Sequence, residues 1–279
     1  MTNFAIRPRI SPAVRWAVAA TLALATASAR PALAQAGDSA RVPGHVFPRS
    51  DALILGGFAV AAVAMRPLDT RLTQELREPE WQHSKLLGRG SAAVRLLAVP
   101  GTLVGGGAFY LVGRARGDET MSGVALHGVE SVVATNVVTY VVKGVAGRAR
   151  PYMDERNSQD FQLFRGFGNR DYQSFPSGHT ASAFAMAAAL TSETAARHPH
   201  SRYVVGGVLY TLATLTGTSR IFDDKHWASD VVAGAAIGTL TGLTVVRYSH
   251  VHPDNYVDRK LTVAPGEGGY PIIFTIPIG

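Results

Sequence analysis

Two cationic residues near the middle of the chain are the first candidates for a chemical role. Lys143 is followed seven residues later by Arg150-Pro151. Seven residues make nearly two helical turns, so a continuous helix would place both cations on one face. There they would repel each other unless an anion lay between them. Gly144 and Gly147 argue against a continuous helix, and the alternative is a basic helix end whose long side chains extend to water.

The second group is the segment 175–179, Phe-Pro-Ser-Gly-His, which directly precedes an alanine-rich run. Ser177 is typical of a residue that caps a helix N-terminus, and the free N–H groups of a first helical turn bind phosphate well. Gly178 lets an anion approach the backbone closely. His179 would lie in the first turn, where its imidazole could donate a proton to a bound group. Helix capping alone would also explain Ser177.

The third group consists of Ser219-Arg220, His226 and Asp230. His226 and Asp230 are four residues apart, so on a helix that begins near Lys225 they would share a face. We expect the carboxylate to accept a hydrogen bond from the imidazole Nδ1, which leaves Nε2 as a nucleophile or base. The alternative is a surface pair, which at this spacing is commonly structural.

Taken together, the three groups resemble a known signature. The chain contains Lys-x6-Arg-Pro, Pro-Ser-Gly-His and Ser-Arg-x5-His-x3-Asp in that order. This pattern is similar to the three-part signature of the superfamily of type 2 phosphatidic acid phosphatases, bacterial acid phosphatases and vanadium haloperoxidases. The resemblance covers Lys143 to Asp230 and is specific, because three separate motifs match. Its filled positions are Lys143, Arg150, Pro151, Pro176, Ser177, Gly178, His179, Ser219, Arg220, His226 and Asp230.

The resemblance implies a phosphatase mechanism with three catalytic residues. His226 would attack phosphorus in line to form a phosphohistidine, and Asp230 would orient its ring. His179 would protonate the departing alkoxide and later take a proton from the hydrolytic water.

The resemblance also implies a phosphate-binding set of three cations and a helix start, which would stabilise the transferring group by charge and position. No metal and no cofactor are implied. Asp223 and Asp224 raise the alternative of a metal site with a histidine, but their spacing matches no common ligand pattern. Arg148 lies outside the signature and could contact substrate or solvent. The phosphate-binding residues are Lys143, Arg150, Ser177, Gly178 and Arg220.

The substrate class is open, because one fold serves lipid phosphates, diphosphates and soluble monoesters in this superfamily. Apolar helices and an aromatic segment at 152–175 favour an amphiphilic phosphate ester, and a membrane surface is a possible partner. That aromatic segment could be a binding lid or could simply pack on itself. The alternatives are a soluble phosphomonoester acid phosphatase, a vanadium-dependent haloperoxidase and an inactive helical protein that binds phosphate.

Six apolar runs must position these residues, and their lengths suit helices better than strands. We therefore expect an all-α fold, a bundle of about six helices rich in Ala, Gly and Thr, which permit close helix approach. A further short helix is expected at 69–77, and the residues 251–279 should form an irregular or β-hairpin tail. The runs are Ala52–Met65, Leu96–Val112, Gly123–Val142, Thr180–Ser192, Tyr203–Thr218 and Val231–Val246.

Composition and the first residues bear on location. Of 279 residues, 47% are hydrophobic and 17% charged, and cysteine is absent, which excludes a disulfide scaffold. The formal charge is +7, but four of the 27 basic residues and none of the 20 acidic ones precede residue 35. The remainder carries only +3, too little to indicate nucleic acid.

Residues 1–34 have the layout of an export signal. Arg7, Arg9 and Arg15 precede an apolar run at 16–27, and Ala32-Leu33-Ala34 at the end of the segment suits cleavage after residue 34. The expected organisation is a signal peptide at 1–34, a flexible segment at 35–50, a helical domain at 51–250 and a C-terminal extension. Only Gly123–Val142 reaches the roughly 20 residues of a membrane span. We therefore favour an exported, soluble or peripheral protein of the periplasm or cell envelope, with an integral membrane protein as the alternative.

Overall fold

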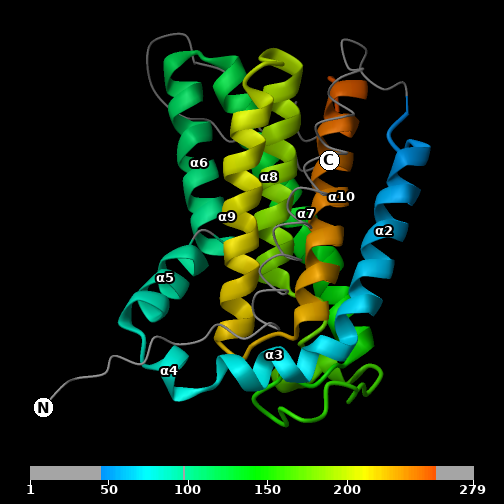
Figure 1. Ribbon diagram of the computed structural model, residues 1–279. Helices are drawn as coiled ribbons and strands as arrows, with labels where there is room; N and C mark the ends of the chain where they lie inside the picture. Colours follow the sequence, from blue (N-terminus) through cyan, green and yellow to red (C-terminus); the bar gives the residue numbers. More distant parts are fainter. Residues whose placement is uncertain (1–44, 97, 256–279) are drawn as a thin grey trace, which may run out of the picture.

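The computed structural model describes residues 45–96 and 98–255, and within them every regular element is a helix (Figure 1). The all-α prediction is therefore confirmed. In chain order the elements are α2 (Arg49–Met65), η1 (Arg66–Leu68), α3 (Asp69–Leu76), α4 (Pro79–Gln82), α5 (Lys85–Leu96), α6 (Val99–Arg116), α7 (Glu119–Ala146), η2 (Arg165–Phe167), η3 (Arg170–Tyr172), α8 (Gly178–Arg197), α9 (Arg202–Phe222) and α10 (Ala228–Val251).

Five of the six apolar runs lie wholly in helices, namely α2 and α7 to α10, and the short helix expected at 69–77 is α3. The run Leu96–Val112 begins at the last residue of α5 and lies in α6 only from Val99. Several helices extend past the apolar runs because polar residues favour their ends. Asp118 caps α7, where its side chain accepts a hydrogen bond from the Met121 N–H at 2.9 Å. This capping moves the start of α7 four residues upstream of the expected Gly123.

The bundle is built around α8, which packs against α7, α9 and α10 (Figure 1). Helix α2 lies alongside α10, and α3 and α4 run across one end of the upright helices. The core joins these elements through small, aromatic and aliphatic side chains, such as Ala188 of α8, Tyr210 of α9 and Leu243 of α10. This arrangement places the N-termini of α8 and α10 at the same end.

Helices α8 and α10 make the most extensive contact in the bundle. A Cβ atom at Gly238 would lie 2.1 Å from the carbonyl oxygen of Ala181, closer than any real contact. The two backbones therefore touch because residue 238 has no side chain. The expectation that small residues permit close helix approach holds at this contact.

Three helical stretches are long and apolar enough to cross a membrane by length and composition: Arg49–Leu76, Glu119–Ala146 and Ala228–Val251. The expectation of a single run of sufficient length is corrected, because the helices continue past the apolar runs. Large apolar side chains are also exposed on the outer faces, including Leu53 and Val60. These features fit the integral membrane alternative.

Several expectations lie outside the described residues. These are the signal peptide at 1–34, most of the segment 35–50 and the hairpin expected within 260–276. Within the described residues the helices run from Arg49, where α2 begins, to Val251, where α10 ends, and the division into domains stays a prediction.

Candidate active site

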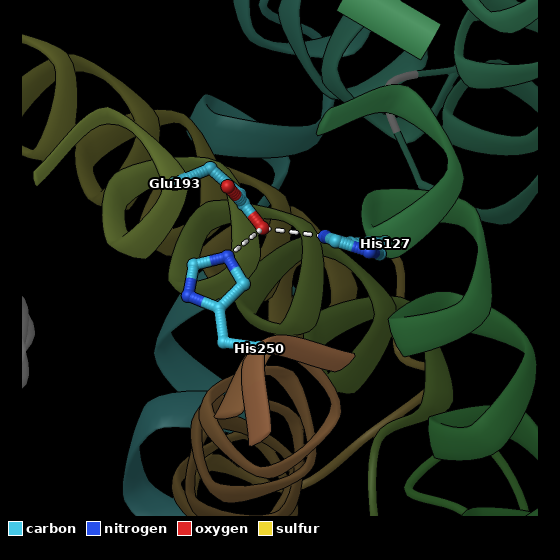
Figure 2. A group of neighbouring side chains, drawn as sticks. All are labelled: His127, Glu193 and His250. Atoms are coloured by element: carbon cyan, nitrogen blue, oxygen red, sulfur yellow. Dashed lines mark hydrogen bonds and ion pairs between the residues drawn. The ribbon is translucent and has the colours of Figure 1, made fainter. Parts of the chain in front are cut away.

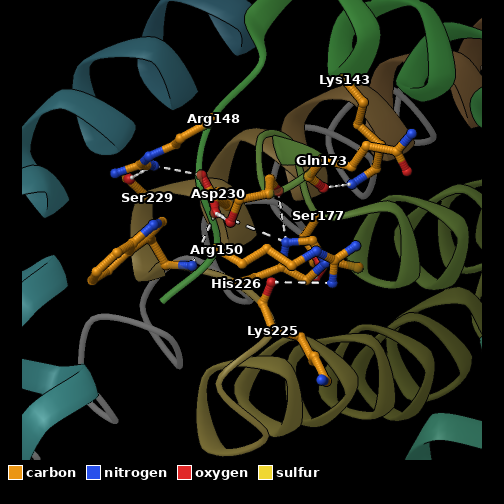
Figure 3. A network of polar contacts seen from close by, with 12 residues as sticks. Lys143, Arg148, Arg150, Gln173, Ser177, Lys225, His226, Ser229 and Asp230 are labelled. Carbon is orange, nitrogen blue, oxygen red and sulfur yellow. Dashed lines mark hydrogen bonds and ion pairs between the residues drawn. The ribbon is translucent and has the colours of Figure 1, made fainter. Parts of the chain in front are cut away.

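Four helix ends meet at one end of the bundle and bring the three sequence groups together (Figure 3). They are the C-terminal ends of α7 and α9 and the N-terminal ends of α8 and α10. Lys143 comes from α7, Ser177 precedes α8, and His226 precedes α10, so residues far apart in the chain share one neighbourhood (Figure 3).

The two cations of the first group do not share a helix. Helix α7 ends at Ala146, and Gly147 adopts a left-handed conformation with φ +55°. A Cβ atom at Gly147 would lie 1.7 Å from the carbonyl oxygen of Gln162, so only glycine fits this turn. The interpretation of one continuous helical face is therefore wrong, and the turn rather than the helix places Arg150.

Both cations are held by backbone carbonyl groups of the loop after α7, and Arg150 also by one between α9 and α10. Lys143 Nζ donates to the carbonyl of Gln173 at 2.6 Å. Arg150 Nε donates to the carbonyl of Arg170 at 3.1 Å, and its Nη1 lies 3.5 Å from the carbonyl of Lys225. These contacts fix the positions of the cations without neutralising their charges.

The second group forms the start of α8, as expected. Ser177 occupies the N-cap position, but in the described chain its hydroxyl accepts from the Thr180 hydroxyl at 2.8 Å instead of from a backbone N–H. A Cβ atom at Gly178 would lie 3.5 Å from Lys143 Cε, so the Lys143 side chain passes over the first turn of α8. A phosphate near that turn would meet backbone N–H groups and a cation together.

The third group lies at the junction of α9 and α10. Arg220 is buried in the last turn of α9 and pairs with Asp223 at 2.7 Å. Its Nε atom is buried with no hydrogen-bond partner among the described residues. Helix α10 begins only at Ala228, so His226 precedes the helix, and the prediction that it shares a helical face with Asp230 is wrong.

The contact between His226 and Asp230 also differs from the expectation. The imidazole Nδ1 is 3.8 Å from Asp230 Oδ2, too far for a hydrogen bond. It lies 2.6 Å from the carbonyl oxygen of Ser174, to which an Nδ1–H would donate. The Ser174 hydroxyl in turn donates to Asp230 Oδ2 at 2.6 Å. Ser174 therefore connects the Asp230 carboxylate to the His226 ring. Because the proton of the ring is on Nδ1, which donates to Ser174, Nε2 carries no proton.

Arg148, which the signature leaves out, is buried behind Asp230 (Figure 3). Its guanidinium forms an ion pair with Asp230 and another with Asp69 of α3, the latter at 2.8 Å. It also donates to the Ser229 hydroxyl at 2.8 Å and to the carbonyl of Ser158. Every N–H of this buried charge therefore faces an acceptor, as a buried guanidinium requires.

Burial and positive charge lower the pKa values of both histidines. The pKa of His226 falls to about 3, chiefly through burial and then through the charge of Lys143, while Asp230 opposes the shift. The pKa of His179 falls to about 4 through burial and then through Arg220, Lys143 and Arg150. Both rings are therefore neutral at pH 7. Lys143 and Arg150 act on both rings, so both imidazoles lie near the same two cations.

The carboxylates considered as metal ligands are engaged by arginines and a hydroxyl group. Asp223 contacts Arg220 and accepts from the Ser91 hydroxyl at 2.8 Å, and Asp224 accepts from Arg77 at 2.7 Å. The contacts with Arg77 and Ser91 anchor the loop between α9 and α10 to the C-terminal end of α3 and to α5.

The aromatic segment 152–175 packs partly against the site. Phe161 lies under the guanidinium of Arg148 at 5.0 Å and contacts the ring of Phe175. Phe167 contacts Tyr140 and fills the space next to Gly144. These rings support the loop that carries the cations, which favours the packing interpretation over a separate lid.

The family model described as PAP2 superfamily matches residues 125–253. Residues 125–253 belong to the PAP2 superfamily. This PAP2 region contains all eight predicted site residues and Arg148, so the resemblance stated from the three motifs is confirmed. Asp69 lies outside it and reaches the site from α3.

Two known proteins are similar to parts of the chain. A stretch of 69 residues is 54% identical to the lipid A 1-phosphatase of Porphyromonas gingivalis and covers 25% of this chain and 15% of that protein. The chain therefore aligns with less than a fifth of this relative. The crystal structure of a transmembrane PAP2 type phosphatidylglycerolphosphate phosphatase from Bacillus subtilis matches with a TM-score of 0.52 and 17% identity. This match covers 74% of this chain and 98% of that one, and it shows a shared fold.

Replacing Arg148 with leucine should destabilise the protein strongly. The change leaves Asp69 and Asp230 buried without their guanidinium, and breaking such a pair costs about 3–5 kcal/mol. Thermal unfolding of the purified chain would measure the loss, with Arg156→Leu, an exposed arginine of the same loop, as the control. Equal melting temperatures for the two variants would contradict a supporting role for Arg148.

Proposed function

We propose that this chain is a metal-independent PAP2 phosphatase that hydrolyses phosphate monoesters or diphosphates through a phosphohistidine. The observation that carries the proposal is the convergence of two neutral imidazoles and three cations at the meeting point of four helix ends. Neutral imidazoles can attack phosphorus and exchange protons, and the cations attract the phosphate.

The nucleophile is Nε2 of His226. The hydrogen bond from Nδ1 to Ser174 fixes the ring and its tautomer, so the lone pair is on Nε2. In-line attack forms the nitrogen–phosphorus bond as the bond to the alkoxide breaks. Asp230 stabilises the positive ring that results, acting across 3.8 Å and through the Ser174 hydroxyl.

The acid and base is His179. A bound phosphate offsets the charges of Arg220, Lys143 and Arg150 that lower its pKa, so substrate binding favours the imidazolium. The imidazolium gives its proton to the departing alkoxide. The neutral ring then takes a proton from the water that cleaves the phosphohistidine, and inorganic phosphate leaves.

The phosphate oxygens are bound by the cations and the start of α8. The unpartnered Nε of Arg220 offers a donor, and the first turn of α8 offers backbone N–H groups beside Lys143. Because phosphoryl transfer depends mainly on positioning and charge, this set supplies the transition-state stabilisation. The proposed phosphate-binding residues are Lys143, Arg150, Ser177, Gly178 and Arg220.

A lipid phosphate is the substrate class that we favour. The relatives are named for lipid A and for phosphatidylglycerolphosphate. A hollow of about 570 Å³ also lies between α2 and α10, lined mainly by apolar side chains such as Phe58 and Ile237. Its polar lining consists of Arg66, Arg148 and Ser229, so the hollow adjoins the network that holds Asp230. An acyl chain would suit such a hollow.

Removing His226 should abolish phosphate release. The purified chain should hydrolyse an aryl phosphate in the presence of EDTA, His226→Ala should be inactive, and Asp230→Asn should lose roughly 10- to 10⁴-fold in rate, as for removal of an orienting carboxylate. Release of inorganic phosphate is the measurement, with the exposed His198→Ala as the control. Turnover by His226→Ala would refute the nucleophile assignment. The same assay with phosphatidate, isoprenyl diphosphate and nucleotide monophosphates as substrates would identify the substrate class.

The pH dependence should report His179. The free enzyme needs His179 protonated, and with a pKa of about 4 the protonated fraction rises roughly tenfold for each unit that pH falls from 7 to 5. His226, with a pKa of about 3, stays neutral in that range. The ratio of kcat/KM for the wild type to that for His179→Gln should therefore rise as pH falls, and substrate ionisation cancels in the ratio. A ratio that is constant between pH 7 and 5 would exclude His179 as the acid.

We further infer that the chain is embedded in a membrane, rather than soluble or peripheral. The support is the three candidate spans and the apolar side chains exposed on their outer faces. The stretch Arg49–Leu76 is the least covered of the three, because only 17% of its most apolar part is buried. Carbonate extraction of membranes should leave the protein in the pellet, because apolar helices in the bilayer resist high pH. Release into the supernatant would restore the peripheral assignment.

A further inference from the structure

A second cluster of titratable side chains lies inside the bundle. His127 of α7, Glu193 of α8 and His250 of α10 point toward one another (Figure 2). Glu193 Oε1 is 2.5 Å from His127 Nδ1 and 3.1 Å from His250 Nε2. All three donor atoms lie within 4.8 Å of one another. Three separate helices therefore each supply one donor atom to a common point.

This cluster is remote from the candidate active site. His127 precedes Lys143 by 16 residues on α7, which at the helical rise is about 24 Å. Asp230 and His250 are separated by 20 residues on α10, or about 30 Å. The phosphatase chemistry uses none of the three cluster residues, so their convergence requires a separate explanation.

The burial of Glu193 indicates that its partners are not incidental. The Glu193 side chain is fully buried, and a buried carboxylate requires positive partners. Arg197 pairs with Oε2 of this carboxylate, while Oε1 faces the two imidazoles. Two ring nitrogens aimed at one oxygen must either both carry protons or share a cation with that oxygen.

The donor set matches a transition-metal ion. Two imidazoles and a carboxylate are common zinc ligands, and imidazole also suits neighbouring divalent metals. Ligand atoms of tetrahedral zinc lie about 3.3 Å apart at zinc–nitrogen distances of about 2.0–2.1 Å. The observed separations of 2.5 and 3.1 Å thus require only a small widening. Arg197, on the other carboxylate oxygen, corresponds to the outer partner that orients a ligating group.

We propose that His127, Glu193 and His250 form a binding site for a divalent transition-metal ion. The ion fastens α7, α8 and α10 together at the end of the bundle opposite the phosphate site. The three residues supply three of the four ligands of a tetrahedral ion. The site is structural for the phosphatase, because the cations of the active site supply the charge for phosphoryl transfer.

Zinc binding to the purified full chain tests the proposal. After removal of metals with EDTA, the chain should bind one equivalent of Zn²⁺ in equilibrium dialysis, and Zn²⁺ should raise the melting temperature. Co²⁺ should give the visible absorption bands of a tetrahedral site. A wild-type chain that binds no Zn²⁺ and no Co²⁺ would overturn the proposal, whatever the variants do.

Matched variants locate the ion. His250→Ala and Glu193→Gln should weaken Zn²⁺ binding by at least about 100-fold, because loss of even an outer partner of a ligand costs roughly 10- to 100-fold. His198→Ala, an exposed histidine beyond the end of α8, should bind as the wild type does. His226→Ala should also retain the ion, which excludes binding at the active site. Loss of Zn²⁺ in His226→Ala but not in His250→Ala would overturn the assignment.

The phosphatase proposal and the metal proposal can be tested independently of each other. EDTA should remove the zinc-dependent rise in melting temperature while phosphate release at 25 °C stays unchanged. Zinc binding can be measured on a chain that has no phosphatase activity at all. Phosphate release that is lost in EDTA and regained with Zn²⁺ would contradict the structural role of the ion.

Discussion

The buried carboxylate of Asp230 is the constraint on which the rest of the site depends. A carboxylate with no exposure to water must be matched by donors on every side. Here the donors are Arg148, the Ser174 hydroxyl and the Trp227 N–H, which come from the loop after α7, the segment before α8 and the turn before α10. The hydrogen bonds to this one carboxylate therefore hold three segments of the chain at fixed positions around it. The Ser174 carbonyl, which belongs to one of these segments, positions His226.

The same geometry creates an electrostatic imbalance on the other side of the ring. Arg148 is balanced by Asp69 and Asp230, whereas Lys143 and Arg150 donate to neutral carbonyl groups. Their charges depress the pKa values of the neighbouring imidazoles instead of being neutralised. A phosphate that binds among the cations relieves this repulsion, so their arrangement attracts the substrate. The fold tolerates the repulsion because helices and buried ion pairs fix the segments that carry the cations.

The sequence predicted α2, α3 and α6 to α10 and the convergence of the site, because the motifs carry short-range signals such as helix ends and residue spacing, but it did not predict α4 and α5. It failed where a contact is tertiary. Ser174 acts through its carbonyl group, which no side-chain pattern reveals, and Asp69 lies 79 residues before Arg148 with no local sign of the pairing. The expected helical contact between His226 and Asp230 was wrong because α10 begins two residues after His226. Span lengths were underestimated because caps such as Asp118 extend helices beyond their apolar runs.

The close contact of α8 and α10 connects the two ends of the molecule. At Gly238 the backbones touch, so neither helix can slide without breaking this contact. The start of α8 holds the proposed phosphate cradle and its end holds Glu193, while α10 carries Asp230 at one end and His250 at the other. A tie among the far ends of these helices therefore restricts the relative movement of the near ends. In a membrane, where apolar burial contributes little to helix association, such polar ties at both ends would set the register on which the spacing of His179 and His226 depends.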